Sequence, residues 1–157
     1  MSFCSYDNNN NCELKKFFDA ARKNNIEIKF NNPWQNPLSF EKVKELTIKS
    51  IMSPDIRSSG DINKIKLGET GTCHKQIGYI PCRIFKTISY GLLGITNSKH
   101  VWELLEKKVI YNNDENKLFY DAMANIDNIE LIKPKNQINK LLFDQQSPLR
   151  YYFNKLS

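Results

Sequence analysis

Apolar side chains recur at every third or fourth position in several stretches of this chain, and that spacing is typical of one face of an α-helix. Polar residues that suit the first position of a helix precede three of these stretches, at Ser39, Ser98 and Asp114. The pattern predicts helices over residues 12–23, 40–53, 82–93, 98–111, 115–126 and 135–143.

Shorter stretches alternate apolar and polar residues or are uniformly apolar, as β-strands are. They predict strands over residues 26–30, 62–67 and 129–132. Together the two patterns predict an α+β fold, which is a helix-rich single domain with a small sheet of short strands around a central helix. The central helix is the one predicted over residues 82–93, where Ile84, Phe85, Ile88 and Leu92 share one face.

The length of 157 residues suits one domain, and no internal repeat divides it. Residues 1–11 are polar and end in four consecutive asparagines, so they offer no apolar face. We expect a disordered N-terminal tail over 1–11 and a single domain over 12–157.

Composition and charge narrow the class of protein only slightly. The chain is 40% apolar and 25% charged, which is typical of a globular domain. A net charge of +6 favours nucleic acid or acidic partners, but it serves solubility equally well. No run approaches ~20 apolar residues, so we expect no membrane span. The first residues lack the pattern of a signal peptide, so we expect an intracellular, cytoplasmic protein with free cysteines.

Cys82 is the candidate nucleophile because it lies at the start of the predicted central helix, just after Pro81. The thiolate is the reactive form of cysteine, and a helix N-terminus favours negative charge. A cysteine nucleophile also needs a base, and the chain has only His74 and His100. The alternative is that Cys82 is a small buried thiol that packs under the helix.

A metal site is not expected. The only cluster of metal-ligating residue types, Cys73, His74 and Cys82, has a spacing that fits no standard zinc finger. No glycine-rich phosphate loop is present in the sequence either. We therefore expect neither a metal nor another cofactor.

One motif suggests a family. Residues 84–90 read Ile-Phe-Lys-Thr-Ile-Ser-Tyr, Leu93-Gly94 follows them, and His100, Leu104, Val109 and Tyr111 come later. This stretch resembles the nucleophile region of ovarian-tumour (OTU)-type cysteine proteases, which cut ubiquitin from proteins. The resemblance covers roughly a quarter of the chain and implies a deubiquitinase-like fold with ubiquitin as the partner.

The motif departs from the OTU pattern at its catalytic positions. With Phe85 and Ser89 in register, Arg83 occupies the position of the nucleophile, and no histidine follows His100. We therefore expect a degenerate, C-terminally short and non-catalytic OTU-like domain that binds ubiquitin or another protein. The resemblance places Tyr79 and Arg83 beside the binding site.

Two alternatives remain open. In the first alternative, the chain is an active thiol-dependent deubiquitinating peptidase, with Cys82 as the nucleophile and His100 as its base. Otherwise it is a helical module unrelated to OTU proteins that binds protein or nucleic acid through its basic surface. If the module binds nucleic acid, the aromatic run at 151–153 is able to stack on nucleic-acid bases. Otherwise this run packs the end of the chain onto the core.

Overall fold

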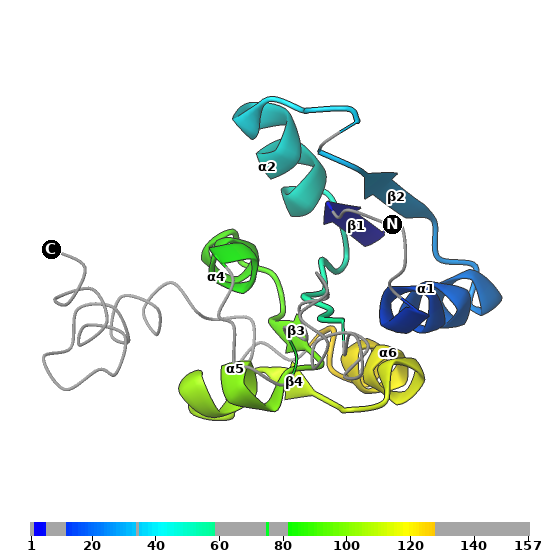
Figure 1. Cartoon of the computed structure of the whole chain (residues 1–157), viewed down its shortest axis with the longest axis vertical. Helices are drawn as coiled ribbons and strands as arrows, with labels where there is room; N and C mark the ends of the chain where they lie inside the picture. The colour runs from blue at the N-terminus through cyan, green and yellow to red at the C-terminus, as the bar shows by residue number, and fades with distance from the viewer. Residues whose placement is uncertain (1, 6–11, 34, 59–74, 76–81, 128–157) are drawn as a thin grey trace, which may run out of the picture.

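The computed structural model describes residues 2–5, 12–33, 35–58, 75 and 82–127 (Figure 1). Its helices are α1 (Cys12–Lys23), α2 (Phe40–Ile48), α4 (Cys82–Ser89), α5 (Lys99–Leu104) and α6 (Glu115–Ala124), and its strands are β1 (Ser2–Ser5), β2 (Ile28–Asn31), β3 (Ile95–Thr96) and β4 (Ile110–Tyr111). The mixed α+β class with short strands is confirmed. No helix in these ranges is long and apolar enough to cross a membrane.

Both strand pairs are parallel, and a helix connects the two strands of each pair. β1 pairs with β2 across α1, and β3 pairs with β4 across α5. Parallel strands need such a crossover, because a tight hairpin turn can join only antiparallel strands. A third parallel segment pairs with β3 through an isolated bridge between Asp55 and Thr96. In this bridge the N–H of Asp55 donates to the Ile95 carbonyl at 2.8 Å.

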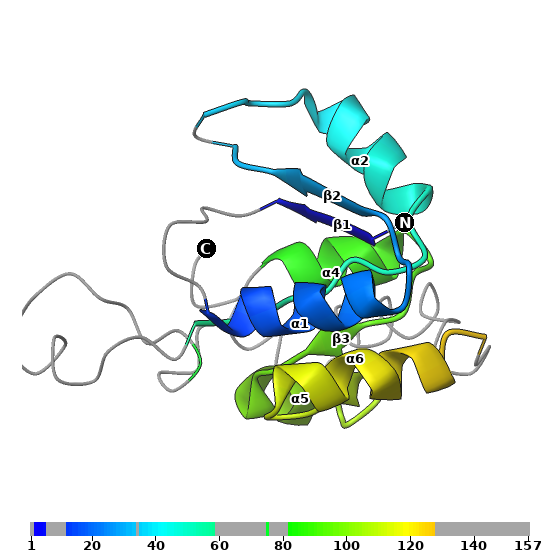
Figure 2. The same ribbon diagram turned by 90° about the vertical axis from the view of Figure 1, so that its right-hand side faces the viewer.

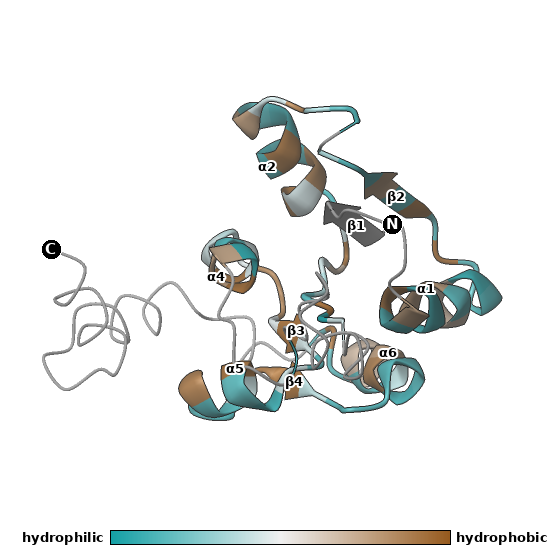
Figure 3. Cartoon of the chain, in the orientation of Figure 1, coloured by the Kyte–Doolittle hydropathy of each residue, from teal (hydrophilic) through white to brown (hydrophobic). Residues whose placement is uncertain are grey.

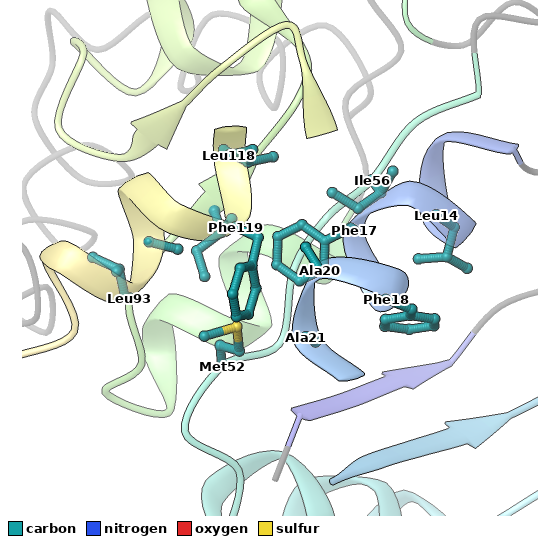
Figure 4. Close-up of a cluster of buried hydrophobic side chains, with 12 residues drawn as sticks. Leu14, Phe17, Phe18, Ala20, Ala21, Met52, Ile56, Leu93, Leu118 and Phe119 are labelled. Atoms are coloured by element: carbon teal, nitrogen blue, oxygen red, sulfur yellow. The ribbon is translucent and has the colours of Figure 1, made fainter. Parts of the chain in front are cut away.

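The main core lies between α1 and α6, which run side by side in Figure 2. The Phe17 ring meets the Phe119 ring edge to face, with centroids 5.6 Å apart (Figure 4). Each such buried side chain contributes on the order of 1.5–3 kcal/mol to folding. A second cluster joins α4 and α5 through Ile84, Ile88, Val101, Leu105 and Val109.

Three helices end in the same hydrogen-bonded turn. In each, a residue with positive φ lies two positions after the last helical residue: Asn25 (56°), Gly91 (84°) and Glu106 (53°). The N–H of the next residue then donates to the carbonyl five positions back, as Leu92 does to Thr87. This is the Schellman motif, and it prefers glycine at the positive-φ position because a Cβ is strained there.

The helix predicted over residues 82–93 is shorter than expected, so Gly94, which follows its predicted end, is not its stop. α4 ends at Ser89, and Gly91 makes the terminating turn. Gly94 has a packing role instead, since a Cβ on it would lie 2.5 Å from a methyl carbon of Val109. Its carbonyl accepts the Ile110 N–H at 2.9 Å, which starts the pairing of β3 with β4.

Other predictions need correction as well. The helix predicted over 98–111 ends at Leu104, and Ile110 and Tyr111, the last two residues of the predicted helix, form β4. The predicted disordered tail is wrong for Ser2–Ser5, which form β1. The helix predicted over 40–53 ends at Ile48. The predicted strands 62–67 and 129–132, the helix 135–143 and the aromatic run 151–153 lie outside the described residues.

The turn after α5 generates a stability prediction. Glu106 has positive φ without being glycine, so Glu106→Gly is expected to raise the free energy of unfolding by about 1 kcal/mol. The ion pair that it gives up with Lys108 is exposed and contributes little. The control, Glu103→Gly inside α5, should lower stability by about 1 kcal/mol. Urea denaturation measures both; a destabilised Glu106→Gly would contradict the strain argument.

Candidate site at the carboxyl edge of the parallel segments

The parallel segments end at a common edge of the second sheet. The segment at Asp55, β3 and β4 run in the same direction, so the residues that follow them lie on one side. Two contacts show that α4 runs in the opposite direction to the segment at Asp55. The Thr87 hydroxyl, late in the helix, is 3.4 Å from the Ser53 carbonyl, whereas Arg83, early in the helix, approaches Asp55. The first turn of α4 therefore lies toward the same side.

We call this side the carboxyl edge. It is formed by polar and charged side chains that come from separate parts of the chain: Asp55, Arg57, Lys75, Arg83, Asn97 and Glu115.

Asn97 is the hub of the carboxyl edge. Its Oδ1 accepts the Arg57 N–H at 2.7 Å, and its Nδ2 donates to the Arg57 carbonyl at 2.8 Å. The same Nδ2 donates to Glu115 Oε1 at 2.8 Å. The side chain thus continues the backbone hydrogen bonding of the sheet beyond the end of β3, and it ties α6 to that end.

Two arginines face one buried carboxylate at this edge. Asp55 is fully buried and accepts from Arg57 through both oxygens, with Nε to Oδ2 at 3.2 Å. Arg83 Nη1 lies 3.6 Å from Asp55 Oδ1. Burial raises the pKa of the Asp55 carboxyl, while the charges of the two arginines act to lower it. The second positive charge therefore helps to keep this carboxylate ionised.

A second ion pair closes the edge from the other side. Lys75 Nζ lies 2.9 Å from Glu115 Oε1 and also donates to the Asn113 carbonyl at 3.0 Å. The backbone N–H of Lys75 donates to the Ser58 carbonyl at 3.2 Å, so Lys75 joins the segment after Asp55 to the start of α6. Asp114 caps that helix by accepting the N–H groups of Asn116 and Lys117.

The structure assigns different surroundings to the residues singled out in the sequence. Arg83 belongs to the carboxyl edge through Asp55. Cys82 is exposed at the start of α4, and His100 is exposed in the first turn of α5. Neither side chain makes a hydrogen bond or ion pair with another described residue, so their catalytic pairing stays a prediction. Tyr79 lies outside the described residues.

Sequence reasoning missed most of this site. Asp55, Arg57, Lys75, Asn97 and Glu115 belong to no recognisable motif, and the spacing of Asp55 and Arg57 is the only local signal, since alternate residues of a strand share a face. Within the residues that the structure describes, no group of three or more His, Cys, Asp or Glu side chains is placed to hold a metal ion.

Removal of the Asn97 amide tests the hub. Asn97→Ala is expected to lower the free energy of unfolding by about 3 kcal/mol, because the Arg57 N–H and carbonyl then stay buried without this partner. Asn97→Asp keeps the acceptor but sets a carboxylate oxygen against Glu115. It should be destabilised at neutral pH and recover in part toward pH ~4. Chemical denaturation at both pH values measures this; wild-type stability of Asn97→Asp would contradict it.

Comparison with known proteins adds no relative to this geometry: no family model, no curated protein and no solved structure matches the chain.

Proposed function

We propose that the carboxyl edge binds a small anionic ligand that carries phosphate groups, and that the chain is a binding domain rather than a peptidase. The observation that carries the proposal is the balance of charge at this edge. Among the described residues of this edge, three cations, Arg57, Lys75 and Arg83, lie beside two carboxylates, Asp55 and Glu115. A bound anion would be attracted by all three of these cations.

The position of the cluster supports the same proposal. In open parallel α/β sheets, ligands bind outside the carboxyl ends of the strands. That rule comes from analogy between folds and supports only the place of the site. The class of ligand follows from the side chains, because guanidinium groups bind phosphate oxygens in pairs and lysine binds them as a point charge.

The surroundings of the thiol support a non-catalytic role. A cysteine peptidase needs a base within hydrogen-bond reach of its nucleophile. Cys82 has no such partner among the described residues, and His100 makes no polar contact that would orient it. Arg83, which takes the nucleophile's place in the OTU-like motif, approaches Asp55. Ubiquitin, which that resemblance implies as a partner, stays a prediction.

Thermal unfolding with added pyrophosphate tests the ligand. A ligand that binds only the native state stabilises it by mass action, so we expect Tm to rise by ~5 °C at about 100 times Kd. Lys75→Gln should reduce this rise strongly, while Lys15→Gln on the exposed face of α1 should leave it unchanged. Sodium chloride at equal ionic strength is the control for screening.

Two outcomes would contradict the ligand proposal. One is an equal rise of Tm with sodium chloride. The other is an unchanged response in Lys75→Gln. Either would assign the carboxyl edge a purely structural role.

A separate prediction concerns peptidase activity. We expect no cleavage of a fluorogenic ubiquitin substrate above background, because general-base assistance alone is worth roughly 10²–10⁴ in rate. Cys82→Ala should then hydrolyse the substrate at the same background rate as the wild type. Hydrolysis that both Cys82→Ala and His100→Ala abolish would instead establish the peptidase alternative.

A further inference from the structure

Helix α2 leaves its large apolar side chains outside the core. Thr47 is its only buried side chain, whereas Phe40 is 59% exposed and Ile48 is 49% exposed. Leu38 and Ile51, just before and after the helix, are also exposed. In Figure 3, parts of the α2 ribbon are brown, the colour of hydrophobic residues. Several exposed apolar side chains on one element are typical of an interaction surface.

The charges on α2 divide into paired and unpaired groups. Glu45 accepts from Lys42 at 2.8 Å and from Lys49 at 2.7 Å. Both lysines lower the pKa of Glu45 to about 2. Glu41 and Lys44 make no ion pair with any residue in the described ranges. Two unpaired charges of opposite sign therefore lie among the exposed apolar side chains of α2.

We propose that α2 binds the α2 helix of a second copy of this chain in an antiparallel arrangement. Phe40, Lys44 and Ile48 are spaced by four residues and form one stripe along the helix. A two-fold axis near Lys44 sets Phe40 of each copy opposite Ile48 of the other, which is the self-complementary contact of a symmetric dimer.

The same axis places Lys44 of the two copies beside each other, and each of these lysines has Glu41 of the other copy within reach. Glu41 of one copy then lies three residues, or about 4.5 Å along the helix, from the level of Lys44 of the other copy. A lysine side chain spans that offset, so two equivalent Glu41–Lys44 contacts form. A partner protein with a single sign of charge would satisfy only one of these residues on each α2. The pattern of charges thus favours a second copy over an acidic or a basic partner.

Sedimentation of the full chain over roughly a hundredfold range of concentration tests the dimer. We expect the wild type to shift from monomer to dimer. Glu41→Lys and Lys44→Glu should each weaken association about tenfold or more, because each variant sets like charges against one another across the axis. The double variant restores opposite charges and should associate as the wild type does.

The matched control is Tyr120→Ser, which removes an exposed aromatic ring from α6 and should leave the dimer intact. A wild type that stays monomeric at every concentration would overturn the proposal. So would a double variant that associates as weakly as the single ones, because the charges would then not meet across the axis.

Discussion

The side chain of Asn97 is the contact on which the second sheet depends. β3 and β4 have two residues each, so their own backbone hydrogen bonds are few. Parallel pairing is also slightly less stable per residue than antiparallel pairing. The three hydrogen bonds of Asn97 extend the sheet to Arg57 and fasten the first residue of α6 to it. The side chain of Asn97 thus supplies hydrogen bonds that the backbone of a longer strand would otherwise supply.

The buried charges around Asn97 bear on what the edge is for. Replacement of a buried ion pair by well-packed apolar residues is often neutral or stabilising, so stability alone gives little reason to bury Asp55 and Arg57. Their geometry does fix the arrangement of the elements. Asp55 orients Arg57 and approaches Arg83, so the segment that contains Asp55 and Arg57 is held to the first turn of α4. The same groups provide the positive charge that the proposed ligand requires.

Local signals predicted the parts of the fold that local chemistry determines. Ser39, Ser98 and Asp114 cap their helices, because a cap needs only a polar side chain and the N–H groups two or three residues later. The apolar face of α1 was predicted as well. The end of α5 was not, because Glu106 adopts positive φ without the glycine that normally marks such a turn. β1 was missed because a short parallel strand exists only through its partner, β2.

The site was harder to predict than the fold, since its contacts join residues that are far apart in the sequence. Asn97 is 40 residues from Arg57 and 18 from Glu115, and Lys75 is 40 residues from Glu115. No periodicity encodes such contacts. Arg83 was singled out only through the OTU-like resemblance, which gives no indication of its contact with Asp55.

Helix α4 touches both surfaces proposed for binding, and this decides where each can be altered cleanly. Arg83 in its first turn reaches the carboxyl edge, whereas Lys86 lies 5.9 Å from the centre of the Phe40 ring on α2. A substitution in α4 would therefore disturb the two surfaces together. Lys75, Glu41 and Lys44 lie outside α4, so changes at these positions separate ligand binding from self-association. One connection between the two sites runs through α4, whose Thr87 hydroxyl holds it to the Ser53 carbonyl, and another runs along residues 49–54, which join α2 directly to Asp55.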